Sequence, residues 1–405
     1  MKRNIIILIG LLTAGWGYSQ TLASYIKEAE ANNPEVQAFE IKYIISKEKI
    51  SESNDLPNTE LSAGIFLSEP ETRTGAQKAS FSIKQMLPWF GTVTARENYA
   101  SSLAEVDYLD IAITKRKIRM SVSQSYYKLF AIKEKQEVLD ENIQLLQTYE
   151  SLALTSLEVG NASAVDVLRL QIRQNELQAQ KDILKSEYNT EKVQFNNLLN
   201  REETLEIDLV ANLDINDVSA QQITDIDVHP ELEKYDRLYE SVTQSELLNQ
   251  KESNPNIGFG LNYIPVADRV GIDFSDNGKD ILMPMVSLAI PILNNKYKSR
   301  SLQNNLRQEQ ISAQKTNRQN LLETVLNTAI NNKEAERIKY NTQVKNLEKA
   351  NDAEEILIKN YETGTIDFND VLDIQELQLK FQMNRIDAIK NYYSQMAVIN
   401  YLTNQ

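Results

Sequence analysis

The chain contains no cysteine and a single histidine, His229. The absence of cysteine excludes disulfides, a thiol nucleophile, a zinc–thiolate site and a lipidated N-terminal cysteine. One histidine leaves little for imidazole-based metal binding or acid–base chemistry. The sequence also lacks a glycine-rich phosphate loop, a Ser-His-Asp set and a pair of acids in a catalytic frame. We therefore expect neither an enzyme nor a bound cofactor or metal.

Glycine and proline are scarce, and the charge is one-sided. The 405 residues include 12 glycines and 9 prolines. Their combined share is about 5%, against about 12% in an average protein. This shortage of chain breakers favours long helices. Lysine and arginine number 43 against 57 acidic residues, for a net charge of −14. An acidic balance argues against nucleic acid as a partner, because binding a polyanion requires clustered basic residues.

Residues 1–20 have the pattern of a signal peptide. Lys2 and Arg3 precede an apolar run from Ile5 to Leu12, and small and polar residues follow up to Gln20. The run is too short to span a bilayer, which leaves an uncleaved anchor as the weaker alternative. No later stretch approaches about 18 uninterrupted apolar residues. If the exported chain spans a membrane, it must do so with β-strands.

A long-period repeat divides the chain into two halves. Asn33–Val36 (NPEV) recurs as His229–Leu232 (HPEL), and the segment 158–160 (EVG) recurs as 362–364 (ETG). Similar landmarks in the same order predict that the halves share one architecture. His229 precedes Pro230 and is expected to be a surface helix cap. We expect a signal peptide at 1–20, a first repeat at 21–205, a linker or equatorial segment at 206–228 and a second repeat at 229–405.

Each repeat contains one segment with strand periodicity, at about 60–86 and about 256–290. Leu61, Ala63 and Ile65 alternate with small or polar residues, and the region from Asn256 to Tyr263 alternates in the same way. Polar loops at 68–78 and 265–280 separate the strands of each hairpin. This pattern predicts four strands per chain with one apolar face, as in a barrel between lipid and water. A soluble sandwich is the alternative.

Very long helices follow the strands. From about Thr92 to Val159 there are 68 residues without glycine or proline, which is roughly 100 Å of helix. Val138, Leu145 and Leu152 recur every seven residues, with Leu139 and Leu146 beside two of them, which is typical of a coiled-coil seam. We expect antiparallel helical hairpins at about 92–199 and about 299–401, reversing at Gly160 and Gly364.

A four-stranded open sheet leaves edge N–H and C=O groups unpaired, which lipid does not tolerate. Copies of the chain must therefore close the sheet, and three copies supply twelve strands. The predicted fold is mainly α with a small β part. It has long antiparallel coiled-coil hairpins and four strands per chain, closing as a trimer into a 12-stranded β-barrel over an α-helical tunnel.

At this point the sequence resembles a known family, the TolC-like outer-membrane efflux ducts. The resemblance is carried by Leu87–Gly91 (LPWFG) and Tyr361–Asp373 (YETGTIDFNDVLD), and it covers nearly the whole exported chain. It implies a homotrimer in the outer membrane of a Gram-negative bacterium, projecting into the periplasm. Such a protein is the passive exit duct of a tripartite efflux or type I secretion system. The implied partners are a periplasmic adaptor and an inner-membrane pump of RND or ABC type.

The resemblance also implies a site at the periplasmic end of the tunnel. The family's pair of constriction aspartates falls on Asp370 and Asp373. In the first repeat Asp166 matches, but Arg169 stands where a second acid is expected, and it would be a charge partner of the acidic tip. Gly160 and Gly364 would lie in tip turns that the adaptor contacts, although turn geometry alone explains a glycine there. The alternatives are helix-start acids on a solvated face and an ordinary exposed arginine.

Two other classes of protein stay open. A periplasmic coiled-coil adaptor predicts one helical hairpin flanked by β-rich halves, and a structural coiled-coil protein predicts unbroken heptads without strands. The exported substrate is not encoded in any residue pattern, because a duct has no selective pocket. Near the strand ends, Trp89 and Phe90 are expected to pack at the strand–helix junction rather than face lipid.

Overall fold

The computed structural model describes most of the chain outside the N-terminus. The described residues are 21–158, 163–215, 229–271, 273–292, 294–363, 365–366 and 368–403. The expected signal peptide, Gly160, Gly364 and residues 216–228 of the expected linker lie outside the described residues.

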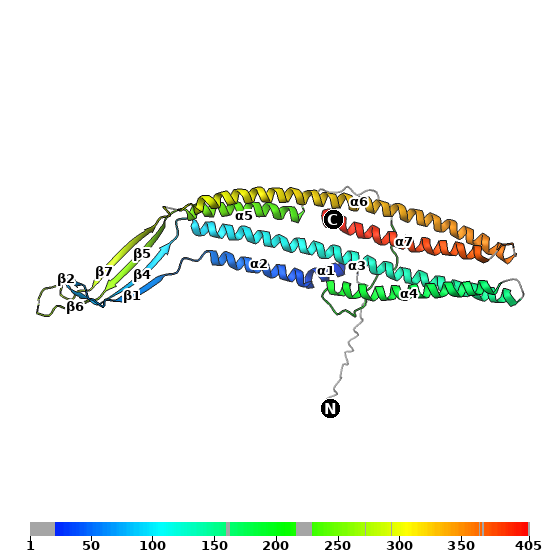
Figure 1. The fold of residues 1–405 in the computed structure, drawn as a ribbon, viewed down its shortest axis with the longest axis horizontal. Coiled ribbons are helices and arrows are strands. Elements are labelled where there is room, and N and C mark those ends of the chain that lie inside the picture. The colour runs from blue at the N-terminus through cyan, green and yellow to red at the C-terminus, as the bar shows by residue number, and fades with distance from the viewer. Residues whose placement is uncertain are drawn as a thin grey trace, which may run out of the picture.

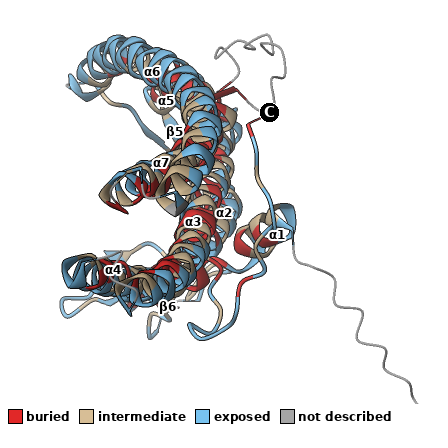
Figure 2. Cartoon of the chain, turned by 90° about the vertical axis from the view of Figure 1, so that its right-hand side faces the viewer, coloured by how far each residue is buried: buried red, intermediate tan, exposed pale blue. Residues whose placement is uncertain are grey.

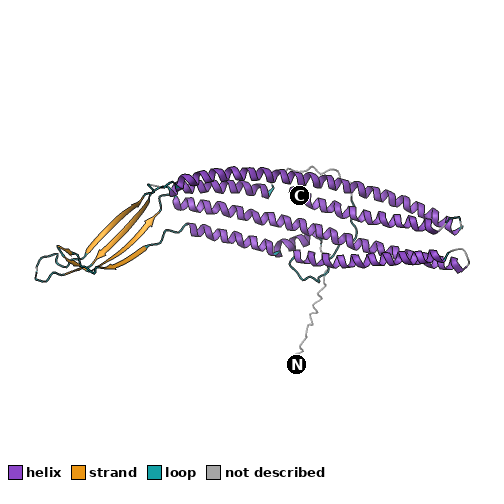
Figure 3. Cartoon of the chain, in the orientation of Figure 1, coloured by secondary structure: helices purple, strands orange, loops and turns teal. Residues whose placement is uncertain are grey.

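Helices make up most of the described chain, and β-strands form one end of an elongated molecule (Figure 1, Figure 3). The prediction of a mainly helical fold with a small antiparallel sheet is confirmed. Two 67-residue helices, α3 and α6, run the length of the helical part. The helices are α1 (Leu22–Asn32), α2 (Pro34–Ser53), α3 (Thr92–Glu158), α4 (Ala164–Leu198), α5 (Pro230–Glu252), α6 (Lys296–Glu362) and α7 (Phe368–Thr403).

The main sheet has four antiparallel strands in the order β1-β4-β5-β7. These strands are β1 (Glu60–Ile65), β4 (Ala79–Leu87), β5 (Asn256–Ile264) and β7 (Ile281–Ala289). A second sheet of three very short strands, in the order β2-β3-β6, lies at the far end of the first (Figure 1). Its members are β2 (Glu71–Thr72), β3 (Gly75–Gln77) and β6 (Val266–Ala267). The expectation of plain loops at 68–78 and 265–280 was therefore wrong, because strands of two or three residues are too short to show a period.

The strand register gives the main sheet one apolar and one polar face. Residues paired across antiparallel strands share a face of the sheet. The apolar face contains the rows Leu61–Ile83–Leu261–Pro284, Ala63–Phe81–Tyr263–Leu282 and Gln85–Phe259–Val286. The polar face contains the rows Ser62–Ser82–Asn262–Met283 and Glu60–Lys84–Gly260–Met285. On the apolar face Leu61, Ile65 and Val286 each have at least 75% of their surface exposed.

The helices form a curved layer rather than a closed bundle, as the view along the long axis shows (Figure 2). Next to the sheet, neighbouring helices follow the order α2, α3, α5, α6. Towards the end away from the sheet, called the distal end below, the order is α4, α3, α7, α6. The layer therefore has two open edges, α6 on one side and α2 with α4 on the other. No helix in the described residues is both long enough and apolar enough to cross a bilayer.

Near the middle of the molecule, aromatic side chains of the first repeat form a core cluster. Tyr25 of α1, Tyr126 of α3 and Phe195 of α4 pack within 6.4 Å of one another, measured between ring centroids. Residues after α4 cover this cluster: the Tyr25 hydroxyl accepts a hydrogen bond from the N–H of Asp208 at 2.8 Å, and the Tyr126 hydroxyl accepts one from Val210 at 3.0 Å.

His229 caps α5, as expected, but it is not on the surface. Its ring is 1% exposed and packs edge-on against Tyr401, with 5.1 Å between ring centroids. Burial lowers the pKa of His229 to about 4. The sequence placed a cap here from the His-Pro pair alone, and nothing in that pair reveals that the end of α7 covers the ring.

Candidate functional site at the distal end of the helices

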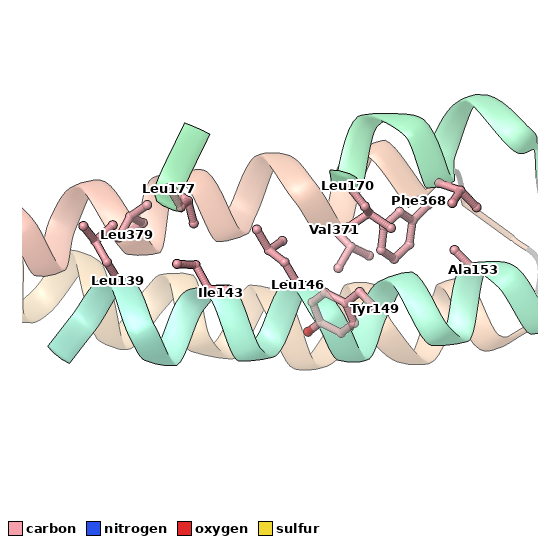
Figure 4. Packing of buried hydrophobic residues seen from close by; sticks show 11 residues of the cluster. Leu139, Ile143, Leu146, Tyr149, Ala153, Leu170, Leu177, Phe368, Val371 and Leu379 are labelled. Carbon is pink, nitrogen blue, oxygen red and sulfur yellow. The ribbon is translucent and has the colours of Figure 1, made fainter. Parts of the chain in front are cut away.

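The distal end is built on an apolar cluster between the two helical hairpins (Figure 4). Tyr149 of α3, Leu170 of α4, and Phe368 and Val371 of α7 are each at most 7% exposed. Side chains of α4 and of α7 thus both pack against α3, which connects the distal ends of the two repeats. The other buried members are Leu139, Ile143, Leu146, Ala153, Val167, Leu177 and Leu379.

The buried stripe on α3 differs from the predicted heptad. Leu139 and Leu146 are buried, whereas Leu152, which the heptad placed in the seam, is 53% exposed. The stripe shifts because α3 packs against α4 on one side and α7 on the other. A helix with two partners buries a broader face than one seven-residue repeat describes.

Asp166 lies in the first turn of α4, as predicted, where it completes a capping box. Its carboxylate accepts a hydrogen bond from the N–H of Ser163 at 3.1 Å, and the Ser163 hydroxyl accepts one from the N–H of Val165 at 3.2 Å. A carboxylate here suits the positive end of the helix dipole. The structure thus gives Asp166 a local role at the start of α4.

Asp370 and Asp373 lie at the beginning of α7, and both are exposed. Neither forms an ion pair with another described residue. Asp373 borders a groove of about 450 Å³ between α4 and α7, and Arg169 borders the same groove. Asp370 and Asp166 do not line it. The structure therefore brings Asp373 and Arg169 to one groove and places the other two predicted site residues outside it.

Two arginines of α4 reach across this groove to α7. Arg169 donates a hydrogen bond to the side-chain oxygen of Asn369. Arg173 lies 3.7 Å from the Glu376 carboxylate and 3.0 Å from that of Glu176 on its own helix. These contacts link the first helical hairpin to the second beside Asp373. The sequence singled out Arg169 as a departure from an acidic pattern and as a charge partner of the acidic tip. Its hydrogen-bond partner Asn369 was missed.

A carboxylate on α6 gathers side chains from two other helices. Glu354 accepts hydrogen bonds from the Tyr149 hydroxyl at 3.1 Å, Gln375 at 2.9 Å and Gln378 at 2.7 Å. Burial, together with the negative charge of Glu354, raises the pKa of Tyr149. Sequence reasoning missed this network because α3, which carries Tyr149, meets the α6–α7 hairpin only in the folded chain. In the described parts of the chain, no group of three or more His, Cys, Asp or Glu side chains could hold a metal ion.

Comparison with solved structures settles the fold. No protein-family model and no curated protein sequence matches the chain. The outer-membrane protein VceC of Vibrio cholerae superposes with a TM-score of 0.73 at 13% identity, over 94% of this chain and 95% of VceC. The chain has the fold of the TolC-like outer-membrane channels.

Two further solved structures have the same fold as this chain. The CmeC outer-membrane channel of Campylobacter jejuni gives a TM-score of 0.74 at 13% identity, covering 94% of this chain and 85% of that one. The MtrE outer-membrane channel of Neisseria gonorrhoeae, solved in an open state, gives 0.73 at 15% identity, over 94% and 88%. The resemblance seen in the sequence is thus confirmed for the fold. In this TolC-like fold, the start of α7, whose residues line the groove, lies at the end of the molecule opposite the sheet (Figure 1).

Proposed function

We propose that the protein is an outer-membrane channel, the exit duct of a tripartite efflux or type I secretion system. The two-faced sheet carries this proposal. Its register gathers the large apolar side chains on one face, and ten of them on the four strands are exposed. An apolar face of this size on a soluble protein would be a liability, whereas lipid satisfies it.

The edges of the sheet support a homotrimer. Strands β1 and β7 are the outer strands, so each leaves a row of backbone groups without a partner in a single chain. Lipid offers these backbone groups no hydrogen-bond partners. Pairing β7 of one copy with β1 of the next copy would supply them. Three copies supply twelve strands, enough for a closed barrel, and the helices of the three copies would form a tunnel below it.

The edges of the helix layer support the same assembly. Ile41 and Ile44 on α2, Ile172 on α4, and Leu302 and Ile338 on α6 are between 55% and 61% exposed. In a trimer, α6 of one copy would lie against α2 and α4 of its neighbour. These side chains would then be covered, and each copy would contribute one third of the tunnel wall.

The distal end would be the constriction of the tunnel. Three copies of exposed Asp370 and Asp373 would repel one another in a narrow pore and attract cations. The contacts of Arg169 and Arg173 with α7 would hold the closed arrangement, with Asp166 capping α4. Gly160 and Gly364 would belong to the surface that a periplasmic adaptor contacts. An inner-membrane pump of RND or ABC type would supply the energy.

Location and assembly are tested on the full-length protein. Fractionated membranes and detergent extraction should place it in the outer membrane as a trimer that needs detergent to stay in solution. A water-soluble monomer would support the periplasmic adaptor or structural protein instead.

The constriction is tested by divalent-cation block of single-channel currents. Replacing Asp370 and Asp373 with Asn should weaken the block about tenfold or more, because two carboxylates per copy are lost. Asp182→Asn removes an exposed carboxylate from α4 at a distance from the tip and serves as the control. Equal block in the double variant and the control would remove these aspartates from the constriction and leave the channel proposal intact.

A further inference from the structure

The junction between the main sheet and the helices carries an apolar rim next to a group of lysines. The rim consists of Phe90, Ile290 and Ile292, which are 77%, 51% and 79% exposed. Phe90 follows β4, and the two isoleucines follow β7. Phe90 was expected to pack inside the junction. Instead its only ring contact with a described residue is with its neighbour Trp89, with 5.8 Å between ring centroids.

Three lysines lie directly beyond the rim, and we call them the lysine collar: Lys251, Lys296 and Lys298. All three are exposed, and none forms an ion pair with a described residue. They are neighbours although they come from two helices. Asn249 at the end of α5 donates a hydrogen bond to the backbone oxygen of Tyr297 at 2.9 Å, which places the end of α5 beside the start of α6.

Two of the three collar lysines occupy a position that is electrostatically unfavourable for the chain alone, whereas Lys251 lies in the last turn of α5, where a positive charge is favourable. Lys296 and Lys298 lie in the first turn of α6, which contains no acidic residue. Positive charges at a helix N-terminus oppose the helix dipole. The nearby acid Glu252 is already shared by Arg300 at 2.9 Å and Arg96 at 3.6 Å. An external anion would therefore be attracted to the collar, in a chain whose overall charge is −14.

The opposite end of the sheet has the reverse arrangement. In the described residues of the two loops there, every basic side chain has a carboxylate partner. Arg269 pairs with Glu71 at 3.1 Å, and Arg73 pairs with Asp276 at 3.0 Å. The remaining pairs are Lys78 with Glu69 and Lys279 with Asp276. Unpaired positive charge is thus a property of the helix side of the sheet.

We propose that the collar and rim bind the headgroups of anionic phospholipids in the membrane leaflet that faces the helices. This inference rests on the proposed membrane function, because the apolar face of the sheet sets where the bilayer ends. Along the chain the order is apolar strand, apolar rim, then lysines. This order matches hydrocarbon, interface and phosphate in a leaflet. Each lysine near an anionic surface contributes attraction equivalent to about a fivefold change in binding.

The alternative occupant is a second copy of the chain. Asp55 and Glu60 lie at the start of the β1 edge and would approach the first turn of α6 across a trimer seam. The observations favour lipid, because Lys251 does not belong to the α6 edge. Its ammonium lies 3.6 Å from the position that a Cβ on Gly91 would take, and Gly91 directly precedes α3 in the middle of the layer.

The test measures which lipids stay with the protein. Full-length trimer is reconstituted in vesicles of phosphatidylethanolamine and phosphatidylglycerol and re-extracted in mild detergent, and the retained lipids are quantified. Wild type should enrich phosphatidylglycerol at least about fivefold over the supplied ratio. The variant Lys251→Gln/Lys296→Gln/Lys298→Gln should lose this enrichment. The matched control, Lys185→Gln/Lys345→Gln/Lys380→Gln, removes three exposed lysines without ion pairs elsewhere on the helices and should keep it.

Three results would overturn the proposal: no enrichment by wild type, unchanged enrichment by the collar variant, or a collar variant whose trimer dissociates while its lipid ratio stays the same. The last would assign the lysines to the seam between copies. Failure of wild type to enter vesicles at all would instead overturn the proposed membrane function, and the lipid site with it.

Discussion

Asn33 and His229 make the same two contacts in the two halves of the chain. Asn33 accepts a hydrogen bond from the N–H of Glu35 at 2.9 Å and donates one to the backbone oxygen of Leu198 at 2.9 Å. His229 accepts from the N–H of Glu231 at 3.3 Å, and its other ring nitrogen lies 3.2 Å from the backbone oxygen of Tyr401. Each side chain caps one helix and anchors the last turn of another.

This equivalence predicts how His229 tolerates substitution. His229→Ala removes the cap and the contact with Tyr401 and should lower the free energy of unfolding by about 2 kcal/mol. His229→Asn restores the donor and acceptor that Asn33 supplies and should recover part of that loss. Thermal unfolding of the detergent-solubilised protein measures both variants. Equal destabilisation by Ala and Asn would show that ring packing, rather than capping, is what matters.

His229 should also make stability depend on pH. Its pKa is lowered from 6.5 to about 4, mainly by burial, with Arg116 and Arg318 adding to the shift and Glu231 opposing it. Between these two pH values the unfolded chain binds the extra proton, so stability falls as the pH falls from 6.5 towards 4, by at most about 3 kcal/mol. The unfolding midpoint of His229→Asn should fall less over this range. If the unfolding midpoints of wild type and His229→Asn changed equally with pH, His229 would not be the source of the pH dependence.

The two faces of the sheet can be separated with adjacent residues of β7. Val286 belongs to the apolar face and Met285 to the polar one. Val286→Arg should cost about 2–4 kcal/mol on insertion, because it places a charge in the hydrocarbon layer. Met285→Arg should insert nearly as well as wild type. The yield of folded trimer in vesicles is the readout, and equal yields would mean that lipid does not cover the Val286 face.

Asp110 of α3 should make the main polar interaction that connects α3 with α2 and α5. It is 8% exposed, and its carboxylate pairs with Lys42 of α2 at 3.0 Å and with Lys234 of α5. Asp110→Asn leaves both lysines with reduced charge compensation and should lower the free energy of unfolding by about 2–3 kcal/mol. Glu105→Gln, an exposed position on the same helix without an ion pair, should change it by less than about 0.5 kcal/mol. Chemical denaturation distinguishes the two, and similar midpoints would remove Asp110 from this role.

Strong periodic signals predicted the fold well. Alternation in Leu61, Ala63 and Ile65 placed the apolar strand face, and the long segment free of glycine and proline placed α3. Short or non-local features were missed. The seven-residue repeat on α3 was partly right: Val138 and Leu145 pack against the distal cluster, whereas Leu152 is exposed because α3 packs between two helices. Phe90 was assigned to a packed junction that leaves its ring exposed.

The distal site was only partly accessible from sequence. The string around Asp370 and Asp373 placed both at the start of α7, and the Asp166 pattern placed a carboxylate in the first turn of α4. Pairing between Arg169 and Asn369 depends on how α4 and α7 meet, which no local pattern encodes. The same holds for the contact between Glu354 and Tyr149, which are 205 residues apart in the chain.

Single-channel recording from the purified full-length trimer in planar bilayers tests the central claim most directly. Wild type should be recorded beside Arg169→Ser/Arg173→Ser, which removes the α4–α7 contacts that would hold the tip closed. We expect small cation-selective openings from wild type and larger ones from the variant. A folded, membrane-inserted trimer that passes no current in either form would contradict a continuous conduit through this protein.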